Sequence, residues 1–190
     1  MAKGTTGIKI ITPRARLSFP SLLTPETQGQ FAKGEYKAQL LFDVKEEADG
    51  IKAMKRAILS VAQTAFGKET KLKDIQHPFR DGNEKTQPGY AGTLYINPKS
   101  KYRPGVVDAK MKEITNEGDI YPGCYVRASV IPYSYVSAGK KGVSFRLCNV
   151  QKIADGEPMA GGTSNPNDDF GPADGGGDDV PFDEGDDLGL

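Results

Sequence analysis

The sequence has no tryptophan, one histidine and two cysteines, and several kinds of functional site are therefore poorly supported. A lone His77 leaves little room for a Ser/His/Asp triad or a histidine-rich metal site. Cys124 and Cys148 lack metal-binding spacing and are expected to be buried free thiols in a reducing cytoplasm. We therefore expect a protein that is not an enzyme and has no metal, no cofactor and no catalytic residues.

Long apolar segments are also absent. No apolar run approaches the roughly 20 residues that a membrane-spanning helix needs. The N-terminus lacks the apolar stretch of a signal peptide. These observations predict a cytoplasmic protein without a membrane partner.

Basic residues are missing from the C-terminal segment, because none follows Lys152. The segment 154–190 contains eleven acidic residues, namely Asp155, Glu157, Asp168, Asp169, Asp174, Asp178, Asp179, Asp183, Glu184, Asp186 and Asp187. All 25 basic residues lie in 1–153 with the other 14 acids, so the formal charges are +11 for the body and −11 for the tail. Such a division of charge points to a nucleic-acid partner or to a segment that mimics a polyanion.

Residues 154–190 are also rich in glycine, proline and asparagine, which predicts disorder because little apolar surface is available for burial. Two apolar islands interrupt this tail, Val180-Pro181-Phe182 and Leu188-Gly189-Leu190. A tail for solubility alone does not need them, although that reading stays open beside a partner-binding tail that also touches its own body. We expect one folded domain, 1–153, and a disordered acidic tail, 154–190.

Alternating patterns predict two extended segments near the N-terminus. In 8–19, the inward residues are Ala15, Leu17 and Phe19, and the outward residues are Arg14, Arg16 and Ser18. In 36–44, the inward residues are Tyr36, Ala38, Leu40 and Phe42, with Lys37 outward. A long loop, 20–35, joins them into a hairpin, and residues 1–7 are expected to be loose.

A helical pattern follows these strands. Asp43 and Glu46 resemble a capping box. Apolar residues then recur at helical spacing at Ala48, Ile51, Met54, Ile58, Val61 and Ala65. Gly67 is a suitable helix stop. The stripe predicts one main helix that packs into the core.

The C-terminal half of the body contains further strands. A short one spans 93–97, and 106–113 is expected to return to the sheet. In 121–135 the inner residues are Cys124, Val126, Ala128 and Val130, and the outer residues are Tyr125, Arg127, Ser129, Ile131, Tyr133 and Tyr135, if Pro132 preserves the register. A basic hairpin tip, 137–142, leads to a return strand, 143–153, whose parity slips near Asn149 as at a bulge.

About five short strands with one helix predict a mainly β protein built on a small, partly open barrel. Its outer face combines tyrosines with basic residues, which suits single-stranded nucleic acid: rings stack on bases and cations follow the phosphates. The predicted DNA-binding residues are Arg14, Arg16, Lys37, Tyr95, Lys99, Lys101, Tyr102, Arg103, Tyr125, Arg127, Tyr133, Tyr135, Lys140, Lys141 and Arg146. The alternative is that the tyrosines pack as amphipathic residues at the rim of the sheet.

Two other functions remain open from the residues. A strand-annealing recombination protein would also bind duplex product and pair complementary strands. A metal-dependent nuclease would have to bring together body acids such as Asp74, Asp81 and Asp108. The sequence gives no reason for these acids to cluster.

Five segments occur in an order that resembles a known family. They are Arg16-Leu-Ser-Phe-Pro20, Tyr36-Lys-Ala-Gln-Leu-Leu-Phe42, Arg103-Pro-Gly-Val-Val-Asp108, Tyr121-Pro-Gly-Cys-Tyr-Val126 and Gly142-Val-Ser-Phe-Arg-Leu-Cys-Asn-Val-Gln151. With the acidic tail, they make the chain similar to the single-stranded-DNA-binding proteins of tailed bacteriophages. The resemblance implies an oligonucleotide/oligosaccharide-binding (OB) fold and sequence-nonspecific protection of single-stranded DNA. The expected setting is phage DNA replication and recombination in the cytoplasm of an infected bacterial host.

The tail carries a second resemblance. Asp178-Asp-Val-Pro-Phe182 is similar to the acidic Pro-Phe tip with which bacterial counterparts recruit replication enzymes. Eight residues, 183–190, follow it here, so the terminal carboxylate belongs to Leu190. The expected partners are phage or host replication and recombination proteins. The predicted partner-binding residues are Asp178, Asp179, Val180, Pro181, Phe182, Asp186, Asp187, Leu188 and Leu190.

Overall fold

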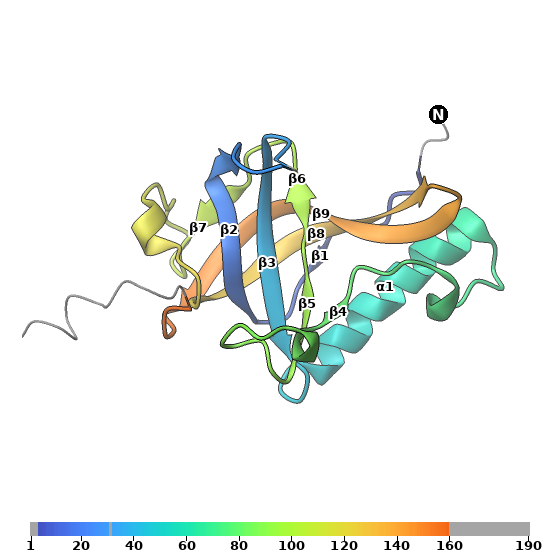
Figure 1. Ribbon diagram of the computed structural model, residues 1–190, viewed down its shortest axis with the longest axis horizontal. Coiled ribbons are helices and arrows are strands. Elements are labelled where there is room, and N and C mark those ends of the chain that lie inside the picture. Colours follow the sequence, from blue (N-terminus) through green and yellow to red (C-terminus); the bar gives the residue numbers. More distant parts are fainter. Residues whose placement is uncertain (1–3, 31, 160–190) are drawn as a thin grey trace, which may run out of the picture. The chain divides into compact units, whose positions relative to one another are not determined.

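A computed structural model describes residues 4–30 and 32–159. Its elements in chain order are β1 (Ile10–Ile11), β2 (Ala15–Glu26), β3 (Glu35–Asp43), α1 (Ala48–Phe66), η1 (Leu72–Asp74), β4 (Arg80–Asp81), η2 (Gly82–Glu84), β5 (Thr93–Ile96), β6 (Lys99–Ser100), β7 (Gly105–Val107), η3 (Glu117–Asp119), β8 (Tyr125–Ser137) and β9 (Lys140–Ala154). Figure 1 shows β8 and β9 as a long hairpin, with α1 beside its tip. Within these described residues, the mainly β architecture with one α-helix is confirmed.

The strands form a partly closed sheet. β2 pairs with β3, β3 with β5 and β6, β6 with β9, and β9 with β8, which returns to β2. Two joints are short: β6 meets β9 in parallel at Lys99 and Arg146, and β8 meets β2 beside Ala15 and Val126. With β5 and β6 taken as one interrupted strand, five strands complete the ring. This is the OB-like topology, closed less regularly than a full barrel.

The main core lies between α1 and the inner face of the sheet. The helix buries Ile51, Met54, Ile58 and Val61, as its stripe predicts, and packs against β8 and β9. Facing side chains in the same cluster include Leu17, Leu40, Phe42, Val126, Val130 and Phe145. The helix ends before Gly67, whose φ of 112° suits glycine. Within the described residues, no helix is long and apolar enough to cross a membrane.

A second apolar cluster covers the opposite side of β3 and β5. Leu41, Tyr90 and Tyr95 are nearly buried there, and Met159 packs against them. The rings of Tyr90 and Tyr95 meet edge to face, with centroids 5.6 Å apart. The sequence pattern places Tyr95 on the DNA-binding face, but its ring is only 4% exposed. The reason is that this part of the sheet is covered on both faces, so a side chain on the outer face is buried as well.

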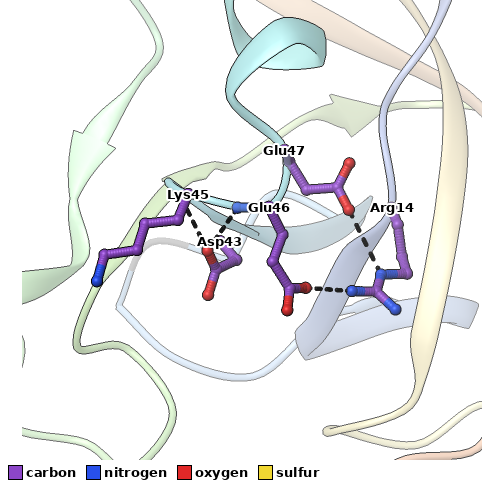
Figure 2. A network of polar contacts seen from close by, with 5 residues as sticks. All are labelled: Arg14, Asp43, Lys45, Glu46 and Glu47. Carbon is purple, nitrogen blue, oxygen red and sulfur yellow. Dashed lines mark hydrogen bonds and ion pairs between the residues drawn. The ribbon is translucent and has the colours of Figure 1, made fainter.

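The turn before α1 ties the helix to β2. The Asp43 carboxylate accepts hydrogen bonds from the backbone N–H groups of Glu46 (2.9 Å) and Lys45 (2.8 Å), and these bonds lower the pKa of Asp43. The Glu46 carboxylate accepts from Arg14 instead of completing the predicted capping box, and Glu47 lies 3.4 Å from the same guanidinium (Figure 2). Asp43 therefore caps the turn that precedes α1. The helix itself begins at Ala48, and the side chain of its N-cap residue, Glu47, makes no capping hydrogen bond, so the capping box predicted for the helix start is not formed.

The course of β2 corrects two expectations. The sequence places Phe19 inward and treats 20–35 as a loop, whereas β2 continues to Glu26 and the connection to β3 spans only 27–34. The pairing of β2 with β3 shifts between Ser18 and Ser21, which is a bulge. The extra residue of a bulge turns the side chains that follow it to the opposite face. A prediction from strict alternation of inward and outward residues therefore fails after Ser18.

The N-terminal residues pair with the sheet, which the sequence does not predict. Thr6 forms an isolated antiparallel bridge with Tyr133 of β8. The backbone N–H of Thr5 donates to the Ser134 hydroxyl oxygen at 2.7 Å, and the Ser134 N–H donates to the Thr5 carbonyl at 2.8 Å. Residues 4–7, expected to be loose, thus lie along the edge of β8.

The two cysteines differ in exposure. Cys124 is buried and free, as expected, and burial raises the pKa of its thiol. Cys148 is free but only half-buried, which corrects the expectation of a buried thiol. It is the extra residue of a bulge in β9, where Leu147 pairs with Val130 and Asn149 with Ser129. This is the parity slip that the sequence predicts near Asn149.

Candidate nucleic-acid interface

The β8–β9 hairpin positions the aromatic part of the candidate site. Residues 124–134 of the first arm alternate as predicted, and Pro132 is buried without disturbing the register. A two-residue turn with positive φ at Ala138 (49°) and Gly139 (76°) joins the arms. Positive φ at both central residues matches the twist of a hairpin, so the pairing continues to the tip. Tyr133 and Tyr135 consequently project from the same face.

Tyr135 is held by its partner across the hairpin. It pairs with Gly142, and a β-carbon at position 142 would lie only 2.4 Å from the Cζ atom of Tyr135. The ring therefore lies over the glycine backbone, where no larger residue fits without displacement. Its hydroxyl lies 3.5 Å from the Oε1 atom of Gln76. Tyr133, opposite Ser144, is 36% exposed.

An open groove of about 680 Å³ runs beside these tyrosines, and we call it the tyrosine groove. Its aromatic lining consists of Tyr102, Tyr133 and Tyr135, together with the edge of Phe145. Its charged lining consists of Lys33, Glu35, Lys99, Lys101 and Arg146. The groove thus brings together six predicted DNA-binding residues from three separate segments: Lys99, Lys101, Tyr102, Tyr133, Tyr135 and Arg146.

Positive charge exceeds negative charge in the tyrosine groove. Glu35 lies 3.8 Å from the Lys99 ammonium and offsets part of its charge. Within residues 4–30 and 32–159, Lys33, Lys101 and Arg146 form no ion pair. Tyr102, at 81% exposure, is among the most exposed large apolar side chains of the described chain. Cations and open rings on one surface are the components that single strands require.

Two neighbouring cavities share Asn97 and Lys99 with the tyrosine groove. One leads towards β2 and is lined by Phe19, Lys37 and Gln39, among others. The other leads towards the segment before β4 and includes Gln76, His77, Arg80 and Tyr135. The surface around Lys99 is therefore continuous in both directions from the groove.

Another group of predicted residues lies around the opposite end of β8. Arg14 is engaged by Glu46 and Glu47, and its guanidinium lies 5.1 Å from the centre of the Tyr125 ring. Arg16 donates to the backbone carbonyls of Gly123 (3.2 Å) and Glu157 (2.6 Å). Eight residues of strand separate Tyr125 from Tyr133, which is about 26 Å. These three residues therefore make local contacts and do not line the tyrosine groove.

The remaining predicted residues do not line the tyrosine groove. Lys37 pairs with Glu26 at 2.6 Å in the cavity towards β2. The Lys141 ammonium lies 5.5 Å from the centre of the Phe66 ring. Arg127 donates to the side-chain oxygen of Gln151 at 2.7 Å. Lys140 at the hairpin tip and Arg103 after Tyr102 are exposed.

Several residues of this surface carry no signal in the sequence. Lys33 is in the loop between β2 and β3, where a lysine carries no periodic signal. Arg80 and His77 come from irregular chain that only the fold brings beside Tyr135. Phe19 is assigned to the core by alternation, but the bulge turns it outward. Each depends on long-range pairing that the local pattern does not encode.

The three acids considered for a nuclease hold local turns. Asp74 accepts from the Lys71 N–H, Asp81 from the Asn83 N–H, and Asp108 from two N–H groups of the turn that follows it. In the part of the chain that the structure describes, no three His, Cys, Asp or Glu side chains gather as a possible metal site.

The first residues of the acidic segment, Ala154–Met159, pack on the body, and we call them the strap. The strap residue Asp155 pairs with Lys152 at 2.7 Å and accepts from the Tyr121 hydroxyl at 2.8 Å. These contacts lower the pKa of Asp155, and the hydrogen bond from Lys152 has the largest effect. The Met159 N–H donates to the Pro122 carbonyl at 2.9 Å. The predicted partner-binding residues, 178–190, lie outside the described residues, as does the rest of the predicted disordered tail.

A family model described as "Enterobacter phage Enc34, ssDNA-binding protein" matches residues 8–180. Protein p50 of the Acyrthosiphon pisum secondary endosymbiont phage 1 is 37% identical over 169 residues, covering 82% of this chain and 88% of p50.

Solved structures show the same fold at lower sequence identity. The single-stranded DNA-binding protein from bacteriophage Enc34, in complex with ssDNA, has a TM-score of 0.68 at 21% identity, covering 80% of this chain and 89% of that chain. A C-terminal truncation of the Enc34 protein has a TM-score of 0.66 at 22% identity, and the match covers 80% of this chain and 87% of that chain. The family match includes all the strands of the ring. The chain therefore belongs to the phage family of the Enc34 ssDNA-binding protein.

Proposed function

We propose that this protein binds single-stranded DNA along the tyrosine groove, without strong preference for sequence. The observation that carries the proposal is the groove itself, in which Tyr102, Tyr133 and Tyr135 lie beside Lys33, Lys99, Lys101 and Arg146. Membership of the Enc34 family supports it, because the relative in that family is a single-stranded DNA-binding protein solved with ssDNA.

The chemistry of the groove favours single strands over duplexes. Each stacked base contributes about 1–3 kcal/mol and any base can stack, so binding should depend little on sequence. Bases in a duplex are already stacked on one another and offer no free faces to Tyr102 or Tyr133. Basic side chains bind the phosphates of single-stranded and of duplex DNA. The preference for single strands should therefore come mainly from the tyrosine rings.

The biological role that we propose is to cover and protect single strands during phage DNA replication and recombination. The protein would act without catalysing a reaction, in the cytoplasm of the infected host. The acidic residues of the tail would compete with DNA for the basic groove, and its apolar islands, 180–182 and 188–190, would recruit phage or host proteins when DNA displaces the tail. Charge complementarity supports this part of the proposal, since the tail has no basic residue.

A direct test compares labelled single-stranded and double-stranded oligonucleotides of the same sequence in a gel-shift or anisotropy titration. We expect much tighter binding of the single strand, and similar affinities for single strands of different sequence. Equal binding of duplex and single strand would contradict the proposal. Incubation with Mg²⁺ in parallel tests for degradation, and renaturation of complementary strands tests for annealing.

A further inference from the structure

Phe19 has a backbone conformation that is rare for phenylalanine. Its φ is 42°, in the left-handed region that favours glycine. It occupies a bulge: Ser18 pairs with Gln39 and Ser21 with Lys37, so Phe19 and Pro20 together face a single residue of β3. Pro20 further restricts the residue that precedes it. Such strain persists where the surrounding structure enforces it, and it is concentrated at functional sites.

The effect of this bulge is to expose a large ring. Leu17 is fully buried on the inner face, and an unbroken strand would bury Phe19 on the same face. Instead the Phe19 side chain is 57% exposed. Burying a phenylalanine is favourable by itself, so neither the backbone conformation nor the exposure is explained by packing.

The exposed ring borders the basic surface already described. Phe19 lines the cavity that also contains Lys33, Lys37, Asn97 and Lys99. Three of these residues, Lys33, Asn97 and Lys99, also line the tyrosine groove. A strand that leaves Tyr133 and Tyr135 and passes Lys99 would therefore reach the Phe19 ring next.

We infer that Phe19 stacks on a base and extends the single-stranded DNA path from the hairpin tyrosines, past Lys99, to β2. The inference rests on the proposed function and adds a contact at the opposite end of the path. Phe19 also borders a separate cavity lined by residues such as Leu23, Ile120 and Pro122, which an apolar protein segment could occupy. On the other side of the ring, Glu26 pairs with Lys37 and Glu35 with Lys99, which leaves Lys33 as an excess positive charge. This excess favours DNA, and the experiment below separates the two occupants.

The absence of tryptophan provides a direct test. In the variant Phe19→Trp, the indole is the sole tryptophan, and stacking on a base should quench its fluorescence. The matched control is Met111→Trp, because Met111 also has positive φ (66°) and high exposure (69%) but lies beside Gln151, away from the groove. Added oligothymidylate should quench Phe19→Trp along the same saturation curve as binding and leave Met111→Trp unchanged. Absence of quenching at saturation would overturn the inference.

Glycine substitutions separate stacking from packing. Phe19→Gly removes the ring and relieves the left-handed backbone, and Met111→Gly makes the same backbone change at the control position. We expect Phe19→Gly to retain or raise the melting temperature and to weaken oligothymidylate binding about 5- to 150-fold, the loss expected for one stacked base. Met111→Gly should bind like the unmodified protein. A Phe19→Gly variant of unchanged affinity would refute the contact.

The unmodified protein and Tyr133→Ala belong in the same titration. If the unmodified protein does not bind single strands, the proposed function itself fails. If it binds and Tyr133→Ala weakens binding, while Phe19→Gly has no effect and Phe19→Trp is not quenched, only the Phe19 contact fails. The Phe19 ring would then be assigned to the second cavity that it borders, the one lined by Leu23, Ile120 and Pro122.

Discussion

The rings of Tyr133 and Tyr135 lie 6.4 Å apart, centroid to centroid, and are inclined to each other by 51°. They are two residues apart on one face of β8, so the pleat of the strand sets their spacing. Tyr135 is fixed above Gly142, whereas Tyr133 is the more exposed of the two. This pair therefore offers one fixed and one freer surface to bases that enter the groove.

Replacement of Tyr133 by alanine should weaken binding of single-stranded DNA by about 1–3 kcal/mol, because one stacking surface is lost. The fold should be little affected, since the ring is 36% exposed. Tyr133→Phe should keep most of the affinity, because the ring rather than the hydroxyl makes the contact. Titrations with labelled oligonucleotide and thermal unfolding measure the two effects. Unfolding of Tyr133→Ala, together with equal damage from Tyr133→Phe, would make Tyr133 a structural residue.

The hairpin that carries these tyrosines could be predicted from the sequence because its determinants are local. Alternation of small apolar residues with tyrosines and arginine defines the faces of β8, and the turn at Ala138-Gly139 joins adjacent strands. Even the bulge near Asn149 leaves a visible change of parity in the sequence. The same locality explains the correct prediction of α1 from its apolar stripe.

Other parts of the site depend on contacts between distant segments and were predicted less well. Arg14 alternates outward as expected, but carboxylates from the start of α1 occupy its guanidinium. Tyr95 also alternates as expected, but Tyr90 and Met159 cover its side of the sheet. No local pattern reveals the cover that Met159 supplies from more than sixty residues away. Phe19 differs because a bulge changes its parity within one strand.

Binding should weaken steeply with salt, because cations in and beside the groove replace counterions on the phosphates. Four cations line the groove, Lys33, Lys99, Lys101 and Arg146, and Lys37 and Arg80 line the cavities next to it. With about 4–6 phosphate contacts, the slope of log affinity against log salt should be about −3 to −4. Lys101→Ala should make the slope less negative by about 0.7. An affinity independent of salt would contradict this electrostatic account.

Affinity should also rise as the pH falls, if the DNA path includes the cavity beside Tyr135. Partial burial, with Lys55 and Arg80 nearby, lowers the pKa of His77 in the free protein. A bound phosphate would offset the repulsion from these two cations, and would raise the pKa of His77. The complex would then bind a proton that the free protein releases, so affinity increases as pH falls through about 6.5. His77→Gln should remove this dependence.

The pH titration needs a stability control. A histidine whose pKa is lowered in the folded state binds its proton more readily when unfolded, so the free protein loses stability below about pH 6.5. Circular dichroism at each pH shows whether the protein remains folded. Equal pH dependence in His77→Gln and in the unmodified protein, with both folded, would exclude His77 as the titrating group.

The strap predicts a difference between two truncations. Ending the chain after Ile153 removes the hydrogen bond from Arg16 to Glu157, the Asp155 contacts and the packing of Met159 on the Tyr95 cluster. The free energy of unfolding should fall by about 2–3 kcal/mol. Ending it after Ala160 keeps these contacts, so stability should be unchanged. Urea unfolding of both proteins measures the difference. Equal stabilities would show that the strap adds nothing to the fold.

The truncation after Ala160 is therefore the suitable protein for testing competition by the tail. It removes residues 161–190, which carry nine acidic residues and no basic ones, and leaves the strap in place. The sequence predicts disorder for this segment, and a disordered chain of this length has ends ~30 Å apart, against a radius of gyration of ~15 Å for the body. We expect the truncated protein to bind single strands more tightly than the full chain. The gain should be largest at low salt, because salt screens the attraction between tail and groove. Affinities of both proteins at two salt concentrations test this, and equal values at both would restrict the tail to recruiting partners.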